Sequence, residues 1–418
     1  MKKTPYITLL SIMLLATTSC NKQIEKINHQ SSIYIVSDTH FLSDSLISES
    51  NEIYTKANLT SDGRVQEFDT ELLDAFVKEV NENKPDYVFI TGDLTLNGER
   101  KSHEDYISYL DKITESKVLV IPGNHDINNL MSKSFLDESS QYVENINEDD
   151  FKELYASYGY NDALYYDDTS LSYIYELDDN RWVLMLDSNN SEYNYEFGTN
   201  FISGFIEEST MNWIKEKLSY AKANNIEVIS TMHHNLLVHN ELFASNYTLY
   251  NYQELLSVYK EYNVKINFSG HLHIQSIRNQ DGIYDIASGS LLDYGNRYGI
   301  LDIYENCYEY QSKKINLSTD DFDFGEYSFN VFYQEYYDKT INADIKVYGE
   351  EASKITDFKS KINTYYFDGD YIAIHKLIKN NKGLVSKIKR QENKYINSIL
   401  EVKNIDQNYL IVEKVSAS

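Results

Sequence analysis

Short apolar runs suited to β-strands alternate with helical patterns over most of this chain, and this alternation restricts the folds it can adopt. The apolar runs cover residues 33–36, 87–90, 118–121, 226–230 and 264–268, and the helical patterns cover residues 68–81, 101–115, 210–224 and 251–262. Strands separated by helices pair in parallel, with the helices packed over the sheet faces. The order predicts an α/β fold with two sheets between layers of helices.

Further segments divide the chain into two predicted domains. Residues 172–177 and 182–186 fit a hairpin, residues 283–287 and 299–304 fit short strands, and the acidic, Tyr-rich stretch 129–170 fits a partly helical insertion. After about residue 318 the pattern changes, and helices are predicted at residues 328–341, 350–366, 371–380 and 384–401. We therefore expect an α/β domain over residues 31–318 and a small helical domain over residues 319–418.

The N-terminal residues have the organisation of a bacterial secretion signal. Two lysines precede an apolar run over residues 7–16, which is too short to span a bilayer. Cys20 follows small residues, as at a lipoprotein processing site. We predict a signal peptide at residues 1–20, lipidation at Cys20, a polar tether at residues 21–30 and an extracytoplasmic, membrane-anchored protein. The alternative is an ordinary cleaved signal peptide and a secreted protein.

Charge and cysteine content narrow the class of partner. Acidic residues outnumber basic ones, giving a formal net charge of −27, which opposes a basic groove for nucleic-acid polymers. With Cys20 lipidated, Cys307 has no intramolecular disulfide partner, so a packed core must stabilise the fold. No later segment has about 18 consecutive apolar residues. We expect a small substrate, no nucleic-acid binding, and membrane contact only through the N-terminal anchor.

Five short motifs rich in Asp, Asn and His each follow a predicted strand. They are Ser37-Asp38-Thr39-His40, Gly92-Asp93, Gly123-Asn124-His125-Asp126, His233-His234 and Gly270-His271-Leu272-His273. Ligands in layered α/β proteins bind at the carboxyl ends of strands, so five separate segments can meet at one edge. Any one of these histidines alone would more often be a hydrogen-bonded core residue. All five motifs together predict a site for two metal ions.

The spacing inside two motifs gives this prediction a geometric basis. In an extended chain, residues i and i+2 point to the same side. Asp38 and His40 are therefore expected to face one ion, and His271 and His273 to face one ion each. Carboxylate, amide and imidazole donors without a thiolate suit Mn, Fe or Zn.

The motif set resembles the calcineurin-like metallophosphoesterase superfamily over about residues 31–311. The resemblance implies a four-layer αββα sandwich. It also implies that one ion is held by Asp38, His40, Asp93 and His273, and a second ion by Asp93, Asn124, His233 and His271. Asp93 would bridge the two ions, and a shared water, deprotonated to hydroxide, would attack phosphorus.

The details of two motifs point to one branch of that superfamily. Gly92-Asp93-Leu94-Thr95 and Gly123-Asn124-His125-Asp126 are most similar to class III cyclic-nucleotide phosphodiesterases, and the lipoprotein start is similar to that of extracytoplasmic phosphodiesterases of Gram-positive bacteria. Leu96 stands where purple acid phosphatases have Tyr, Ile127 where protein phosphatases have Arg, and Asn235 where many relatives have Pro. The last departure leaves open whether His233 or His234 is the ligand.

Five further residues are candidates for roles around the metals. His125 is expected to protonate the leaving group or stabilise an oxyanion. Asp126 either orients His125 or acts as a turn residue. His234 is a candidate for bonding the bridging water or supporting a ligand. Asn97 and Arg64 are candidates for substrate contact, although a solvated position is the preferred interpretation of Arg64.

The resemblance therefore predicts a two-metal phosphoester hydrolase, with a phosphodiesterase acting on nucleotide-like substrates, including cyclic nucleotides, as the leading hypothesis. A phosphomonoesterase or nucleotidase is the first alternative. A non-catalytic surface lipoprotein that uses the fold to bind a ligand is the second. The helical domain is expected to cover the site and restrict substrate size.

Overall fold

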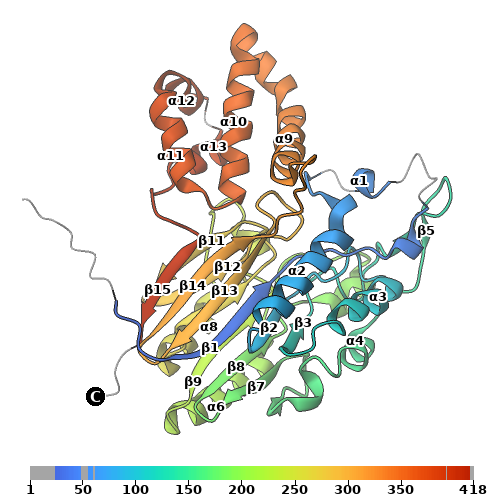
Figure 1. Cartoon of the computed structure of the whole chain (residues 1–418), viewed down its shortest axis with the longest axis vertical. Helices are drawn as coiled ribbons and strands as arrows, with labels where there is room; N and C mark the ends of the chain where they lie inside the picture. Colours follow the sequence, from blue (N-terminus) through green and yellow to red (C-terminus); the bar gives the residue numbers. More distant parts are fainter. Residues whose placement is uncertain (1–23, 49–54, 60–61, 392, 415–418) are drawn as a thin grey trace, which may run out of the picture.

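Two β-sheets form the centre of the protein (Figure 1). The computed structural model describes residues 24–48, 55–59, 62–391 and 393–414. The first sheet, in the order β15-β14-β13-β1-β2-β3, contains β1 (His29–Val36), β2 (Tyr87–Thr91), β3 (Lys117–Ile121), β13 (Arg297–Tyr304), β14 (Cys307–Lys314) and β15 (Tyr409–Glu413). The first three strands pair in parallel, so their carboxyl ends lie at one edge.

The second sheet brings two more strand ends to the same region. In the order β11-β12-β10-β9-β8-β7-β6, it contains β6 (Tyr165–Tyr166), β7 (Tyr173–Asp178), β8 (Arg181–Leu186), β9 (Glu227–Met232), β10 (Ile266–Ser269), β11 (Ser276–Gln280) and β12 (Ile283–Ala287). β9 and β10 pair in parallel. Thus five strands that each precede a motif run in two parallel groups.

Helices cover the outer face of each sheet, which confirms the predicted four-layer α/β sandwich. The covering helices are α2 (Asp69–Asn83) and α3 (Arg100–Leu110) on the first sheet, and α6 (Glu208–Ala223) and α8 (Tyr252–Tyr262) on the second. On the second sheet, the ring of Trp182 stacks on that of Tyr220 at 5.8 Å between centroids. Such apolar helix faces remove the outer strand residues from water, which stabilises the layered arrangement.

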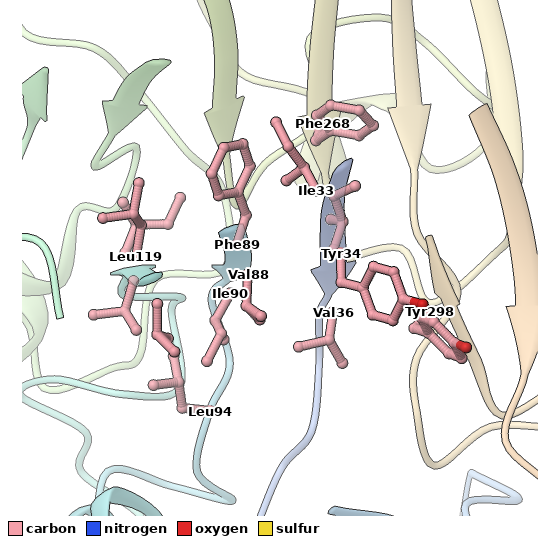
Figure 2. Close-up of a cluster of buried hydrophobic side chains, with 14 of the residues drawn as sticks. Ile33, Tyr34, Val36, Val88, Phe89, Ile90, Leu94, Leu119, Phe268 and Tyr298 are labelled. Atoms are coloured by element: carbon pink, nitrogen blue, oxygen red, sulfur yellow. The ribbon is translucent and has the colours of Figure 1, made fainter. Parts of the chain in front are cut away.

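The strands before the motifs are buried on both faces, which explains why they are continuous apolar runs. Figure 2 shows Ile33 and Phe89 on the side of Phe268 from the second sheet, whereas Tyr34 lies on the opposite side beside Tyr298. The Tyr34 and Tyr298 rings are 5.3 Å apart. Because a one-residue slip would move each side chain to the wrong face, this packing fixes the register and hence the positions of the strand ends.

Short elements occupy the connections. They are η1 (Asp44–Leu46), α1 (Lys56–Leu59), η2 (Gln66–Phe68), β4 (Lys133–Ser134), β5 (Gln141–Tyr142), α4 (Glu148–Leu154), η3 (Tyr160–Asp162), η4 (Ser191–Tyr193), α5 (Asn194–Phe197) and α7 (Ala244–Tyr247). The expected insertion at residues 129–170 contains β4, β5 and α4.

A helical region stands over one end of the sheets (Figure 1). It contains α9 (Phe324–Tyr348), α10 (Ala352–Phe367), α11 (Tyr371–Asn380), α12 (Lys382–Lys389) and α13 (Lys394–Leu400), with η5 (Gly349–Glu351) between the first two. The single helix predicted at residues 384–401 is two helices. The range 319–418 is not helical throughout, because β15 returns to the first sheet and pairs with β14. This five-residue edge strand is too short to give a clear sequence pattern.

The predicted signal peptide and Cys20 lie outside the described residues. Part of the predicted tether is bound to the turn between β13 and β14: the Ile27 backbone NH donates to Asn306 Oδ1 at 2.9 Å, and Asn306 Nδ2 donates to the Glu25 carbonyl at 2.8 Å. Cys307 is buried and forms no disulfide within the part of the chain that the structure describes. Within the described ranges, no helix has the length and apolar character needed to cross a membrane.

Candidate metal centre

The structure brings all seven predicted ligand residues together from the ends of five strands. They are Asp38 after β1, Asp93 after β2, Asn124 after β3, His233 after β9 and His271 after β10, with His40 and His273 in the adjoining loops. All except His273 are buried, and the His273 side chain is 19% exposed. The edge predicted from the strand order is therefore where the motif residues meet.

The backbone at this edge is not extended, so the geometric argument from i and i+2 spacing was wrong. Five of the seven residues have positive φ angles in the left-handed region, between 38° and 65°: Asp38, His40, Asp93, His271 and His273. Residues with a Cβ rarely adopt this conformation, which costs of order 1–3 kcal/mol each and persists where the surrounding fold enforces it. Tight turns, not extended segments, aim these side chains inward.

The donor atoms form two groups that share one carboxylate. Oxygen and nitrogen atoms of Asp38, His40, Asp93 and His273 lie within 4.8 Å of one another, as do those of Asp93, His233 and His271. In the second group, His233 Nε2 lies 3.2 Å from Asp93 Oδ2 and 3.2 Å from Asn124 Oδ1. Two sites with a shared Asp93 match the ligand division that the resemblance implied.

The hydrogen bonds of two histidine rings show whether the donor groups suit cations. In each ring the nitrogen that faces away from the donor group has a hydrogen-bond partner. His233 Nδ1 lies 2.9 Å from the Thr91 carbonyl oxygen, which can only accept, so Nδ1 carries the proton. In the neutral ring, the Nε2 lone pair then faces the oxygens of Asp93 and Asn124. Similarly, His273 Nδ1 bonds to Asp293 at 2.7 Å while its Nε2 faces His40 Nε2 at 3.1 Å. Lone pairs turned toward one another fit shared metal ions.

Electrostatics lead to the same conclusion. Although burial lowers it, the carboxylates of Asp93 and Asp38 raise the pKa of His233 to about 9. Against the same effect of burial, Asp38 and Asp293 raise the pKa of His273 well above its usual value. The carboxylates thus stabilise positive charge at these two rings, whereas burial lowers the pKa of His271 well below its usual value. Together with the donor atoms that face one another, this negative potential fits two divalent cations.

Glycine is required at Gly123 because two motifs touch there. A Cβ atom on Gly123 would lie 2.2 Å from both the backbone nitrogen and Oδ1 of Asp93. The glycine allows the loop after β3 to pack against the shared carboxylate, whose Oδ1 also accepts the His125 backbone NH at 2.8 Å.

His125 and Asp126 do not act as a pair. His125 Nδ1 bonds to the Leu96 carbonyl at 2.6 Å, which leaves Nε2 for another partner, and the residue is half-buried. The Asp126 carboxylate instead accepts four hydrogen bonds from Gly123, Leu94 and Thr95. The expectation that Asp126 orients His125 is therefore wrong, and Asp126 holds together the loops after β2 and β3.

Hydrogen bonds show where two further candidates, His234 and Asn97, lie. His234 bonds to Ser188 Oγ through Nδ1 and to the Ile202 carbonyl through Nε2, both at 2.8 Å, so both ring nitrogens are used. His233, and not His234, thus has a nitrogen in the metal groups. The Asn97 backbone NH donates a hydrogen bond to the Glu99 carboxylate at 3.1 Å.

The Arg64 side chain is not solvated, so the preferred interpretation from the sequence was wrong. Only 9% of its side chain is exposed, and it pairs with Asp62 at 2.7 Å. The loop that carries Arg64 contacts the first group, because Gln66 Nε2 donates to the His40 carbonyl at 2.7 Å. Burial, reinforced by the charge of Arg64, holds the pKa of His40 well below its usual value.

Sequence reasoning missed the groups that orient the rings. Asp293 binds His273, and the Asn246 carbonyl lies 3.2 Å from His271 Nε2. Neither residue belongs to a recognisable motif, and neither directly follows one of the five parallel strands. Two divalent cations held by the seven motif residues would activate a water molecule and neutralise phosphoryl oxygens during hydrolysis.

A small pocket of about 210 Å³ adjoins the two motif histidines of the last loop. It is lined by Asp62, Phe243, Tyr247, His271, Leu272, His273, Asp293 and Phe367. The rings of Tyr247 and His271 are 4.8 Å apart, and Phe367 belongs to α10 of the helical region. The wall beside the candidate metal centre is therefore largely aromatic.

Comparisons with known proteins identify the family of the chain. A relative from Coxiella burnetii, described as a probable cyclic nucleotide phosphodiesterase, is 28% identical over 192 residues, which cover 45% of this chain and 60% of that protein. Similar solved structures include a dimetal phosphatase from Danio rerio (13% identity, 69% of this chain and 97% of that chain, TM-score 0.49) and a purple acid phosphatase from yellow lupin, Lupinus luteus (12% identity, 70% and 52%, TM-score 0.41). The sequence model of the calcineurin-like phosphoesterase family matches residues 31–275, which include every predicted metal ligand. Because this match covers more than half of the chain, the protein belongs to the calcineurin-like phosphoesterase family.

Proposed function

We propose that this metal-dependent phosphoester hydrolase is a phosphodiesterase acting on nucleotide-like substrates, with cyclic nucleotides as one candidate class. The observation that carries the proposal is the pair of donor groups sharing Asp93, because a two-metal site can stabilise both the attacking and the leaving oxygen. In this proposal the seven motif residues hold two Mn, Fe or Zn ions.

His125 supplies the proton for the leaving group. Its Nδ1 is held by the Leu96 carbonyl, so a protonated ring can donate from Nε2. Its ring stands nearly perpendicular to that of His40, with centroids 4.8 Å apart, which places it beside the first donor group.

The aromatic pocket supports an organic substituent on the phosphate. Phe243, Tyr247 and Phe367 line it next to His271 and His273, so a planar group can stack there while its phosphate faces the metals. Its volume of about 210 Å³ suits one ring-bearing group and not a polymer.

Purified protein loaded with Mn would be assayed on bis(4-nitrophenyl) phosphate, 4-nitrophenyl phosphate, 3′,5′-cyclic AMP and AMP. We expect faster turnover of the diesters, and an Asp93→Asn variant provides the inactive control. A clear preference for the monoesters would reject the diesterase in favour of a phosphatase or nucleotidase. Protein with two ions per molecule that is inactive on all four compounds would favour the non-catalytic binding protein.

We also propose that the protein is anchored outside the cytoplasm by a lipid on Cys20, with secretion as the alternative. The sequence of residues 1–20 supports this proposal. In a bacterial host, the full chain should partition into the detergent phase and Cys20→Ser should not. Equal partitioning of both into the aqueous phase would favour secretion.

A further inference from the structure

Arg64 is a buried cation whose hydrogen-bonding capacity is largely unused. Its Nη2 pairs with Asp62 Oδ2 at 2.7 Å, and the side chain is only 9% exposed. Its Nε and Nη1 are buried and have no hydrogen-bond partner among the described residues. Leaving charged donors buried and unpaired is energetically unfavourable, so such donors indicate a missing acceptor.

The loop that carries Arg64 is fixed in place by two separate parts of the chain. Gly63 has a φ of +92°, and a Cβ there would lie 3.0 Å from the Phe332 ring of α9. On the other side, the Val65 backbone NH donates to the Leu292 carbonyl at 3.0 Å, next to the residue that binds His273. These contacts fix the loop, and Asp62, which pairs with the guanidinium, lines the pocket beside His271 and His273. Arg64 is therefore held next to the candidate metal centre and is not a freely moving surface group.

The charges around Arg64 determine which kind of ligand its unused N–H donors can bind. Asp62, Asp293 and Asp93 all stabilise its positive charge, but only Asp62 reaches it with a hydrogen bond. The free Nε and Nη1 each carry N–H groups of a charged guanidinium, which donate strong hydrogen bonds to carboxylate or phosphate oxygens. When cations occupy the adjacent donor groups, they and the guanidinium repel any further cation. A neutral ligand would gain little from the charge of Arg64. The ligand that fits is therefore an oxyanion.

We propose that Arg64 binds a non-bridging oxygen of the substrate's phosphoryl group through its unused N–H donors. The proposal rests on the phosphoesterase function and deepens it by naming the group that holds the phosphate opposite the metals. Asp62 both pairs with Arg64 and lines the aromatic pocket, so the phosphate lies beneath the guanidinium while the organic substituent points toward Phe243 and Phe367.

The test uses inorganic phosphate as the probe and the full-length, Mn-loaded protein. Isothermal titration calorimetry would give the phosphate affinity, and elemental analysis would give Mn per molecule. We expect Arg64→Gln to weaken phosphate binding by about 10- to 100-fold with Mn content unchanged, because charge-assisted hydrogen bonds are lost. Arg64→Lys should fall between the two, since the ammonium keeps the charge but not the planar set of N–H donors.

Two controls separate anion binding from a structural role. Asp62→Asn keeps the guanidinium but weakens its ion pair with residue 62, so phosphate affinity should be retained or increased. Arg100→Gln removes a guanidinium that already binds Glu144 and Asp150, and phosphate affinity should not change. If Asp62→Asn weakens binding as much as Arg64→Gln, the ion pair and not the free nitrogens matters, and the proposal is overturned.

The remaining outcomes also decide the question. Unchanged phosphate affinity in Arg64→Gln, or a loss of Mn in that variant, would overturn the proposal. If Arg64→Gln does not fold, Arg64→Lys replaces it: weaker phosphate binding at constant Mn supports the role, and unchanged binding rejects it. Phosphate is a product of monoester hydrolysis and an analogue of both ester classes, so this result does not depend on whether the enzyme prefers diesters.

Discussion

Gly123→Ala should disable both halves of the candidate metal centre with a single added methyl group. The new Cβ would lie 2.2 Å from Asp93 Oδ1, and real Cβ atoms essentially never come closer than 3.0 Å to such an atom. Separating them from 2.2 to 3.0 Å requires a displacement of about 0.8 Å. Because Asp93 belongs to both donor groups, the shift affects both ions at once.

This displacement is large compared with what a metal site tolerates. Metal–ligand distances must be held within roughly 0.2 Å, and a misplacement of about 1 Å near the chemistry can cost roughly 100-fold in rate. Overpacking should also lower the free energy of unfolding by about 1–3 kcal/mol. We therefore expect Gly123→Ala to hold fewer than two ions per molecule and to lose at least about 99% of its activity.

The measurement combines elemental analysis, thermal unfolding and turnover of a chromogenic phosphodiester. Gly383→Ala in α12 is the matched control, because a Cβ there meets nothing within 4 Å. It should retain metal and activity. A Gly123→Ala protein that binds two ions and keeps full turnover would refute the argument that close packing of this loop positions Asp93.

The remaining predictions concern four other side chains. Asp293→Asn should weaken Mn binding by roughly 10- to 100-fold in calorimetric titrations, because Asp293 orients His273. His125→Ala should keep two ions by elemental analysis but lower kcat by about 100- to 10,000-fold; loss of metal would contradict its assigned role. Burial lowers the pKa of His103 to about 3, so the folded state keeps it neutral while the unfolded chain protonates it below about pH 6.5. Stability is thus lost on acidification, and His103→Gln should remove roughly 2 kcal/mol of the loss between pH 6.5 and 5 in urea unfolding, whereas an unchanged pH slope would contradict this. Leu272→Ala should cost about 2–5 kcal/mol by the same method, because the side chain is buried against the helical region.

The sequence was sufficient to predict the edge where the motif residues meet. Strands such as residues 33–36 and 118–121 are buried on both faces, so they form apolar runs that are easy to recognise, and the ligand residues follow them within a few positions. Strand order then determines which ends are neighbours. This is why Asp38 and Asn124, 86 positions apart in sequence, could both be assigned to one site.

What the sequence did not reveal depends on contacts between distant segments. The positive φ angles at Asp38 and His273 are imposed by packing and contradict the local assumption of an extended chain. The partner of His273, Asp293, lies in a loop without a motif. Arg64 was interpreted as a surface residue because nothing in its neighbourhood predicts that α9 would pack over Gly63.

The last motif joins the helical region to the metal centre, and this explains how an added domain can affect the chemistry. In the segment 271–274, the two histidines face the donor groups, whereas Leu272 and Ile274 belong to the apolar cluster of α10, α11, α12 and α13. The next residue, Gln275, donates its backbone NH to the Phe367 carbonyl at 2.9 Å, at the position where the family match ends. Removing the helices would expose both apolar side chains and release the turn that aims the histidines. The helical region is therefore a structural support of the site as well as one wall of its pocket. We expect substitutions in α10 to alter substrate choice without touching a metal ligand.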